Sequence, residues 1–591
     1  MIRDFSTRKI NPQMNTDKHR LRRRKRRKPS NRKTQTISRY LKKSVFICIH
    51  LWLIFLLVSC HSKPTDLRAL APADALVYLE TNDLGKTLAA LTESKAFEEL
   101  GENKTDFSAV ENVQFAVVVT GFETSENKIS DEQSDLNFKP RFVAIAETHR
   151  WKPTAVSIAE NQIGRFVKDA YGDDVKLEKS EKADAKFFVW TSGGNSENEA
   201  RKIFAAVSGG TIYVGNDESL IDKCLAVRRG ETESLLKNEN LTRAREAANA
   251  QNTENVEDAK GTDSENFPLA FGYVSNDGVA QIANLAAVSL AIDASEDDAA
   301  RSFIARVVPP ILQKSVREIS WTARRSEQGI EDKVFVATSD ETSSVFTEAM
   351  QTAPKTQTNS AEFLPPDITS ATRYNLQNPQ TAWRGLLAAA LKQTDDAASA
   401  NVINAFSGEL LGAYGVGDAE TFLSAVDSEI LTAQPGDEGE KSIVIVTVKD
   451  AEKIKKSLAE INFKAAPEKS ADAEIWKSED GETAAAFVEN HLIFGDAESV
   501  LKCLEAGRSG RNFTQNQLFQ KFNESRAVAV TFARDTDSAE KIVYVFGKIK
   551  YENKKTATVY LTETRFTNGG IERRTVSAFG LIGTIIEQVK N

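Results

Sequence analysis

Cysteine and histidine, the side chains best suited to act as nucleophiles, proton carriers or metal ligands at neutral pH, are scarce in this sequence. Among 591 residues there are four cysteines and five histidines. They are Cys48, Cys60, Cys224, Cys503, His19, His50, His61, His149 and His491. Their spacing contains neither a Cys-x-x-Cys pair nor a zinc-type cluster. We therefore predict no metal site, no bound cofactor and no cysteine redox centre.

Cys60 is the thiol whose surroundings suggest chemistry. It directly follows Leu57, Val58 and Ser59, at the end of a run from residue 44 to 59 that contains no charged side chain. This arrangement resembles the lipobox of bacterial lipoproteins, in which a small residue precedes a lipid-modified cysteine. There the thiolate is the nucleophile that takes the lipid before the signal is cleaved. The resemblance implies a membrane anchor on Cys60.

The segment before Cys60 has the layout of an export signal. Residues 1–43 hold 17 Lys and Arg against the two acids Asp4 and Asp17, and the apolar run follows directly. Because a membrane-spanning helix takes ~20 apolar residues, this shorter run favours a cleaved signal peptide. Translation starting at Leu41 would leave a compact signal of residues 41–59. We predict a location in the bacterial cell envelope, with the body outside the cytoplasmic membrane.

The body beyond the signal is acidic. From Cys60 onward there are 59 basic and 82 acidic residues, a net charge of −23. Binding to nucleic acid relies on clustered Lys and Arg that displace counterions from phosphates, and an acidic body repels polyanions. The composition therefore argues against a nucleic-acid partner.

The body contains an internal repeat. Residues 212–225 resemble 492–504, with Gly215 and Gly495 280 positions apart, and residues 178–190 resemble 468–476 when Trp190 is matched to Trp476. A later match between Gly329 and Gly570 is 241 positions apart, so the first copy contains extra residues. We assign part of these to a polar surface loop, residues 249–266.

The pattern of strands and helices indicates an α+β fold. Strand-like runs at residues 114–119, 141–146 and 442–448 alternate with helix-like runs at 83–92, 155–170 and 451–461. Short turns join neighbouring strands, which favours mainly antiparallel sheets in two tandem related modules. The predicted segments are a basic leader 1–40, a signal peptide 41–59, a tether 60–69, module copies 70–350 and 363–591, and a polar linker 351–362.

The opening of the first copy carries a family resemblance. Ala71-Pro72-Ala73-Asp74 precedes Leu76-Val77-Tyr78-Leu79, and Leu364-Pro365-Pro366-Asp367 opens the second copy similarly. These motifs resemble exported bacterial proteins grouped as domain of unknown function 3352. That family implies an envelope location and brings no activity or catalytic residue.

The remaining motifs favour structural roles. Gly215-Asn216 and Gly495-Asp496 fit turns whose Asn or Asp caps a helix, because a complete phosphate-binding motif is missing. A glycine-rich strand is expected around Gly412, Gly415 and Gly417. Cys224 and Cys503 fit helical core positions, with a disulfide between the copies as the alternative. His149 and His491 fit surface sites, His491 in a turn.

No catalytic residues can be assigned from the sequence, and we expect a binding or scaffolding protein, with a protein partner of unknown identity, rather than an enzyme. One alternative is an envelope hydrolase with a carboxylate or Ser/Lys site between the modules; converging buried ionisable groups would favour it. A second alternative is a carrier of a hydrophobic ligand, which a closed apolar cavity would support.

Overall fold

The fold is known from a computed structural model, in which Pro64–Asn591 form one compact unit. The structure describes residues 65–102, 105–128, 134–193, 201–254, 268–293, 298–354, 360–394, 396–409, 416, 418–436, 442–459, 467–470, 472–535, 538–550 and 557–590.

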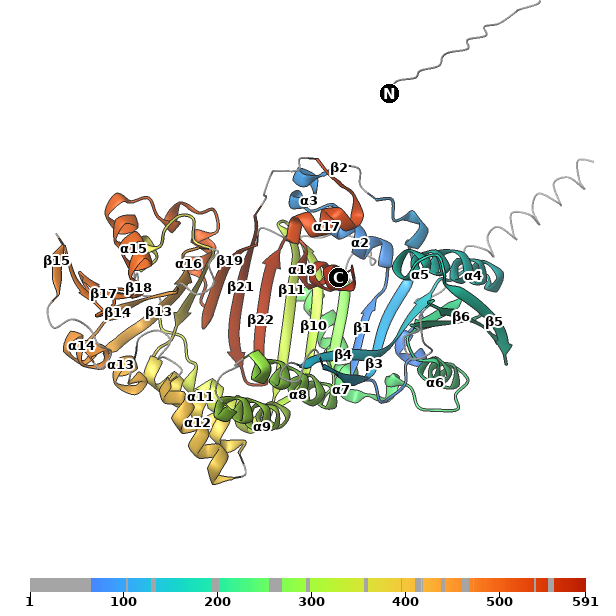
Figure 1. The fold of residues 1–591 in the computed structure, drawn as a ribbon, viewed down its shortest axis with the longest axis horizontal. Coiled ribbons are helices and arrows are strands. Elements are labelled where there is room, and N and C mark those ends of the chain that lie inside the picture. Colours follow the sequence, from blue (N-terminus) through green and yellow to red (C-terminus); the bar gives the residue numbers. More distant parts are fainter. Residues whose placement is uncertain are drawn as a thin grey trace, which may run out of the picture. The chain divides into compact units, whose positions relative to one another are not determined.

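Within these residues, twenty strands pair antiparallel in one continuous order, whose central part can be followed in Figure 1. The order is β5 (Lys176–Lys182), β6 (Ala185–Thr191), β7 (Lys202–Ser208), β8 (Thr211–Gly215), β4 (Ser134–Glu147), β3 (Gln114–Lys128), β1 (Val77–Thr81), β9 (Ala270–Val274), β10 (Val316–Ser326), β11 (Gly329–Thr338), β22 (Gly570–Ser577), β21 (Thr558–Thr567), β19 (Ala529–Asp535), β12 (Ser370–Asn375), β13 (Val426–Gln434), β14 (Ile443–Val448), β18 (His491–Asp496), β17 (Thr483–Val488), β16 (Ala473–Lys477) and β15 (Glu468–Ser470). A separate pair joins β2 (Gly101–Glu102) to β20 (Lys548–Ile549).

The pairing of β11 with β22 divides this order into a first half, β1 to β11, and a second half, β12 to β22. Lys333 lies opposite Arg574 at the centre of this junction. Lys333 forms an ion pair with Glu572 (2.6 Å) and Arg574 forms one with Glu331 (2.5 Å). The junction is thus a continuous strand ladder with crossed ion pairs on one face.

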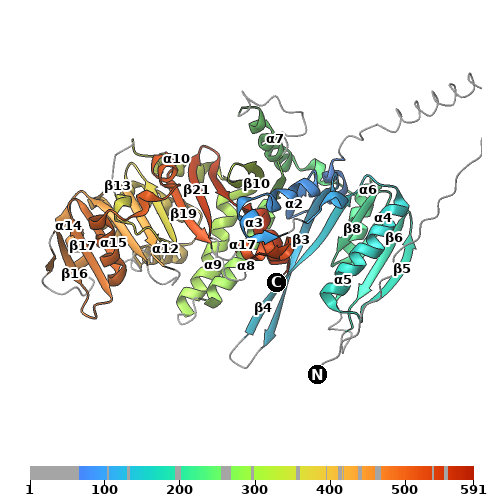
Figure 2. The ribbon, with the colours of Figure 1, turned by 90° about the horizontal axis from the view of Figure 1, so that it is seen from above.

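Helices cover the sheet. In the first half they are α2 (Leu84–Thr92), α3 (Lys95–Leu100), α4 (Lys152–Ile158), α5 (Gly164–Tyr171), α6 (Glu218–Arg228), α7 (Glu239–Glu254), α8 (Asn276–Asp293), α9 (Asp298–Ser315) and α10 (Asp340–Ala349). In the second half they are α11 (Pro379–Lys392), α12 (Ala397–Glu409), α13 (Ala419–Ala425), α14 (Ala451–Ala459), α15 (Ala497–Ser509), α16 (Phe519–Glu524), α17 (Ser538–Phe546) and α18 (Gly580–Lys590). Figure 2 shows α7 on one side of β10, and α8 and α9 on the other.

Local sequence explains individual elements. Asp83 begins α2 because its carboxylate accepts the Lys86 amide (3.0 Å), and Asn378 and Asp418 cap α11 and α13 similarly. The apolar run of β14 is continuous because both faces are buried: Ile443 and Ile445 belong to one core, and Val444 and Val446 to another.

The expected α+β class with a large antiparallel sheet is confirmed. The predicted strands at 114–119, 141–146 and 442–448 coincide with β3, β4 and β14. The expected loop at 249–266 is wrong at its start, since α7 continues through Glu254. Of the expected linker, residues 360–363 form a short 3₁₀ helix with Ser360 and Ala361 buried.

Candidate functional site: an apolar pocket in the second half

A partly open pocket of about 490 Å³ lies between the second half of the sheet and helices α11 and α13. This volume falls within the usual range for small-molecule sites. Most of its lining is apolar, and the exposed Tyr374 and Leu386 are among the residues that line it. The lining comprises Met350, Thr372, Tyr374, Leu376, Pro379, Ala382, Trp383, Leu386, Val416, Phe422, Leu423, Ile430, Thr432, Val444, Phe494, Val528, Ala529, Thr531, Thr564 and Phe566.

A row of threonines crosses the sheet at this pocket. On five neighbouring strands, directly opposite residues share one face. The row is Thr432, Thr372, Thr531, Thr562 and Thr575. The hydroxyls of Thr372 and Thr531 lie 3.0 Å apart, and those of Thr562 and Thr575 lie 2.9 Å apart. The first three threonines line the pocket, so its floor offers hydroxyl groups within an apolar wall.

The corresponding row of the first half is filled with larger side chains. Trp321 and Val334 lie as far from the β10–β11 turn as Thr562 and Thr575 lie from the β21–β22 turn, which identifies the equivalent row. That row is Val117, Leu79, Gly272, Trp321 and Val334. Leu79 and Trp321 close over Gly272, where an added Cβ would lie 2.8 Å from each of them. Trp321 is 6% exposed, and its indole N–H donates to Asp332 (2.8 Å). The same place in the sheet is therefore packed in one half and hollow in the other.

The pocket is suited to a neutral, apolar ligand. Among its described lining residues, Tyr374 is the single ionisable side chain. A charged group inserted among these side chains would lose its hydration without gaining a partner, which is unfavourable. A ligand with a charged head would therefore keep that head at the mouth and insert its apolar part.

A larger cavity, of about 640 Å³, lies between the halves but offers little chemistry. Its described lining has three charged side chains, Lys95, Glu99 and Arg534, and contains no serine, cysteine or histidine. Arg534 donates to the carbonyl oxygen of Pro366 (2.8 Å). With one carboxylate and no serine, this lining gives no observation in favour of the alternative hydrolase site.

The two cysteines of the body are core residues, as expected. Cys224 and Cys503 are fully buried in separate cores and both are free thiols, so the alternative of a disulfide between the copies is wrong. Burial raises the pKa of Cys224 to about 12 and also raises the pKa of Cys503. Both thiols are therefore protonated and unreactive at neutral pH.

The prediction for His491 is wrong, whereas that for His149 holds. His491 begins β18 and is buried. The ring of Phe363, from the 3₁₀ helix Ser360–Phe363, packs against it with the ring centroids 5.1 Å apart. Burial lowers the pKa of His491, and neither ring nitrogen has a hydrogen-bond partner. A neutral imidazole without a partner acts there as a packing group. His149 is exposed at the surface.

Gly215 and Gly495 lie at the ends of strands β8 and β18 rather than in turns, and only Gly495 of the two has a positive φ (140°); one predicted cap is also wrong. Asp496 caps α15 through the amide of Ser499, as expected. The cap of α6 is Asp217 instead of Asn216, because the Asn216 side chain bonds the Phe142 amide (3.0 Å) and the Pro140 carbonyl (2.7 Å) of the neighbouring strand β4. Gly412, Gly415 and Gly417 lie outside the described residues.

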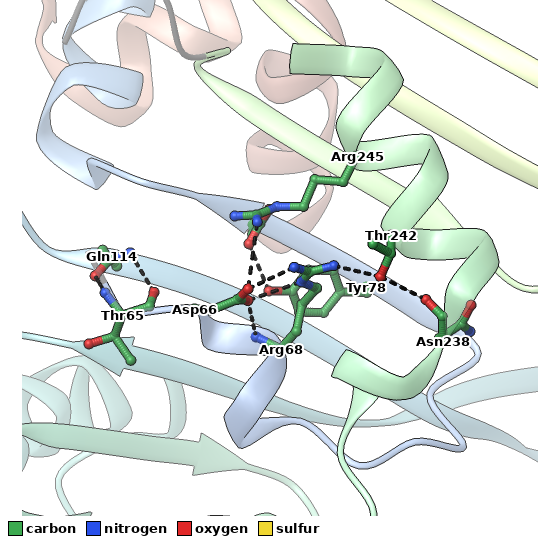
Figure 3. A network of polar contacts seen from close by, with 9 residues as sticks. Thr65, Asp66, Arg68, Tyr78, Gln114, Asn238, Thr242 and Arg245 are labelled. Atoms are coloured by element: carbon green, nitrogen blue, oxygen red, sulfur yellow. Dashed lines mark hydrogen bonds and ion pairs between the residues drawn. The ribbon is translucent and has the colours of Figure 1, made fainter. Parts of the chain in front are cut away.

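The first described residues are fastened to the body by a polar network (Figure 3). The Arg68 guanidinium donates to Asp66 (2.7 Å) and to the Thr242 hydroxyl of α7 (3.0 Å). Arg245 of α7 forms an ion pair with Glu80 and lies 3.7 Å from Asp66. Burial raises the pKa of Asp66, but the hydrogen bonds and charges of Arg68 and Arg245 outweigh burial and hold it below its usual value.

The predicted anchor lies outside the described residues. Leu57, Val58, Ser59 and Cys60 are among residues 1–64, which the structure does not describe. Within the described part of the chain, no helix combines the length and apolar character needed to cross a bilayer. No group of three or more potential metal ligands occurs there either.

Comparisons with known proteins yield little. No family model matches the chain, and no curated protein matches it, so the resemblance to domain of unknown function 3352 stays a prediction. Among solved structures, the chain is similar to crystal form I of TP0453 at 9% identity and a TM-score of 0.22, covering 40% of this chain and 99% of that chain. Crystal form III is similar at 9% identity and a TM-score of 0.21, covering 39% of this chain and 99% of that chain. Crystal form IV has the same identity, TM-score and coverage of this chain, with 96% of that chain covered. At these TM-scores the likeness carries no argument.

Proposed function

We propose that this protein is a cell-envelope lipoprotein, anchored through Cys60, whose body binds an apolar molecule in the pocket of the second half. The observation that carries the binding role is the hollow beside Thr372 and Thr531, at a place that Leu79 and Trp321 fill in the first half. A packed counterpart on the same sheet supports a binding role, because this fold does not require the hollow.

We further propose that the body consists of two related α+β modules. The strand order from β5 to β11 has the same form as the order from β15 to β22, and both hairpins at the junction have the same register. Gly215 and Gly495 also occupy matching positions, where a Cβ would collide with the carbonyls of Phe142 and Ser442. These correspondences support duplication of an ancestral module.

The strand registers revise one detail of the repeat. Trp476 lies opposite Ala485, and the residue opposite the corresponding Ala205 is Phe188. The matching partner of Trp476 is therefore Phe188, two positions before Trp190. The connections before β6 and β16 are both two residues long, so Trp190 lies two positions further along its strand than Trp476 does.

Two substitutions at Thr372 test the binding role. Thr372→Leu introduces the residue that the first half has at this place, Leu79, and fills the hollow, whereas Thr372→Val removes the hydroxyl with little change in volume. With dansyl-undecanoic acid as the probe and residues 61–591 as the protein, we expect the first change to weaken binding about tenfold, about 1.4 kcal/mol.

The second change serves as the matched control and should leave the affinity within about threefold, because apolar contact dominates binding in such a pocket. Wild-type affinity in Thr372→Leu, with the variant folded, would refute the pocket as the binding site.

The anchor has its own test. Radiolabelled palmitate supplied to growing cells should label the wild type and fail to label Cys60→Ser. Equal labelling of both proteins would refute lipidation of Cys60 and would not bear on the proposed binding in the pocket.

A further inference from the structure

Trp151 is exposed in a way that the fold does not explain. It is the residue before α4, and its side chain is 80% exposed, the largest fraction among the exposed large apolar side chains of the described residues. The side chain makes no capping hydrogen bond to the helix. Tryptophan is normally buried or placed at a boundary between apolar and aqueous surroundings, because its indole has an apolar body and a polar N–H.

Trp151 lies on the side of the body where the described chain begins. The Thr65 amide donates to the side-chain oxygen of Gln114 (2.8 Å), and the Gln114 amide donates to the Thr65 carbonyl (2.9 Å). The same Gln114 oxygen lies 2.9 Å from the ring Nε2 of His149. Because Trp151 follows His149 by two residues, its Cα lies within ~7 Å of that of His149. Figure 3 shows the pairing of Thr65 with Gln114.

The tether between the predicted anchor and this point is short. Cys60 and Thr65 are five positions apart. A fully extended chain of that length reaches at most ~18 Å. The polar network of Asp66 and Arg68 holds the following residues against α7. A lipid on Cys60 would therefore keep the Thr65 side of the body next to the bilayer.

The charges beside Trp151 suit an anionic membrane. Arg150 donates to the carbonyl oxygen of Ala109 (3.2 Å), and Lys152 donates to that of Asp184 (2.8 Å). Both contacts are to neutral oxygens, so they leave the cationic charge available. The body carries a net charge of −23 beyond residue 59, so an anionic surface would repel most of its faces.

We propose that the turn Thr148–Lys152 rests on the membrane surface, with the indole of Trp151 among the lipid headgroups. This inference rests on the proposed lipid at Cys60 and adds the orientation of the body to it. Interfacial tryptophan and flanking cations are the groups that membrane surfaces favour.

Fluorescence quenching tests this orientation. Lipidated mature protein, residues 60–591, is reconstituted in phosphatidylethanolamine and phosphatidylglycerol vesicles that contain brominated phospholipid, and flotation of the vesicles is measured on the same sample. We expect tryptophan emission of the wild type to be quenched, and at least half of that quenching to disappear in Trp151→Phe.

A matched control places a tryptophan elsewhere. Leu501 on α15 is 45% exposed and lies in the second half, beside β18. Leu501→Trp in the Trp151→Phe background should add emission that the brominated lipid does not quench. Protein that floats with the vesicles but shows equal quenching with and without Trp151 would overturn the orientation and leave the anchor standing. Protein that does not float would overturn both.

Discussion

The two halves of the sheet share a strand order and differ in what fills one row of it. In the first half Trp321 and Leu79 close over Gly272, whereas in the second half threonines leave a pocket of about 490 Å³. Backbone pairing is the same in both rows, so the difference lies in side-chain volume and in the helices that cover each row. Trp321 shares a core with residues of α17 and α18, whereas α11 and α13 line the pocket. The comparison teaches that a β scaffold can keep its ladder while a few residues turn a packed core into a cavity.

The threonines suit the hollow for a physical reason. β-branched residues favour strands, so Thr372 and Thr531 support the ladder without the volume of leucine or tryptophan. Their hydroxyls bond each other at 3.0 Å, which satisfies polar groups that would otherwise lie unpaired in an apolar wall. Thr564, on the neighbouring row, also lines the pocket.

The largest effect on the free energy of unfolding is expected from a cavity made at Trp321 in the first half. Trp321→Ala removes a buried indole and leaves Asp332 without one donor, so we expect a loss of about 3–5 kcal/mol in the free energy of unfolding. Denaturant unfolding measures it. The exposed Trp151→Ala is the control and should stay within about 0.5 kcal/mol of the wild type. A loss below about 1 kcal/mol for Trp321→Ala would show that the first half is not packed there.

A smaller effect on the free energy of unfolding, and one that depends on pH, is expected from substitution of Asp332. Arg573 occupies the equivalent position in the second half. Burial raises the pKa of Asp332, partly offset by hydrogen bonds from the Trp321 indole and the Leu581 amide. Since the folded pKa lies above the ordinary 3.8, the stabilising contribution is present below that pH and is lost as pH rises through the folded pKa.

Asp332→Asn should remove this dependence. The free energy of unfolding of the wild type minus that of the variant should be largest in acid and fall as the pH rises above 3.8. A lost acceptor for the Leu581 amide should add a constant offset of about 1 kcal/mol. A difference that stays flat across this range would contradict a raised pKa.

The smallest effect concerns the junction, where the two halves should behave alike. Glu331→Gln and Glu572→Gln each break one of the crossed ion pairs with Arg574 and Lys333. Because these groups are only partly buried, each change should cost about 0.2–1 kcal/mol. The two costs should agree within about 0.5 kcal/mol. A gap larger than about 1 kcal/mol, measured by denaturant unfolding, would break the proposed symmetry.

Much of the architecture could be predicted from local patterns in the sequence. Strand runs such as 442–448, helices such as 83–92 and the core positions of Cys224 and Cys503 follow from apolar periodicity, which records burial directly. The proposed repeat is indicated in the sequence at Gly215 and Gly495, where the chain must approach a neighbouring backbone closely. Because a side chain larger than glycine would collide with the neighbouring backbone, such positions can be recognised in the sequence as glycines.

The pocket could not be predicted because it depends on residues that are far apart in the chain. Thr372, Thr432 and Thr531 meet only through strand pairing. Single threonines at strand positions look the same whether they face solvent, core or cavity. The prediction for His491 is wrong for a related reason, since the ring that packs against it, Phe363, belongs to a distant segment.

Much of the added length of the first half lies in α8 and α9, where the second half has the shorter α17.

The number of probe molecules bound per chain tests the central claim most directly. If one half is open and the other is packed, isothermal titration of residues 61–591 with dansyl-undecanoic acid should give a stoichiometry of one. The folded fraction of Trp321→Ala should then bind a second molecule. Two equal sites in the wild type, or no binding at all, would contradict the division of the two halves into a packed and an open site.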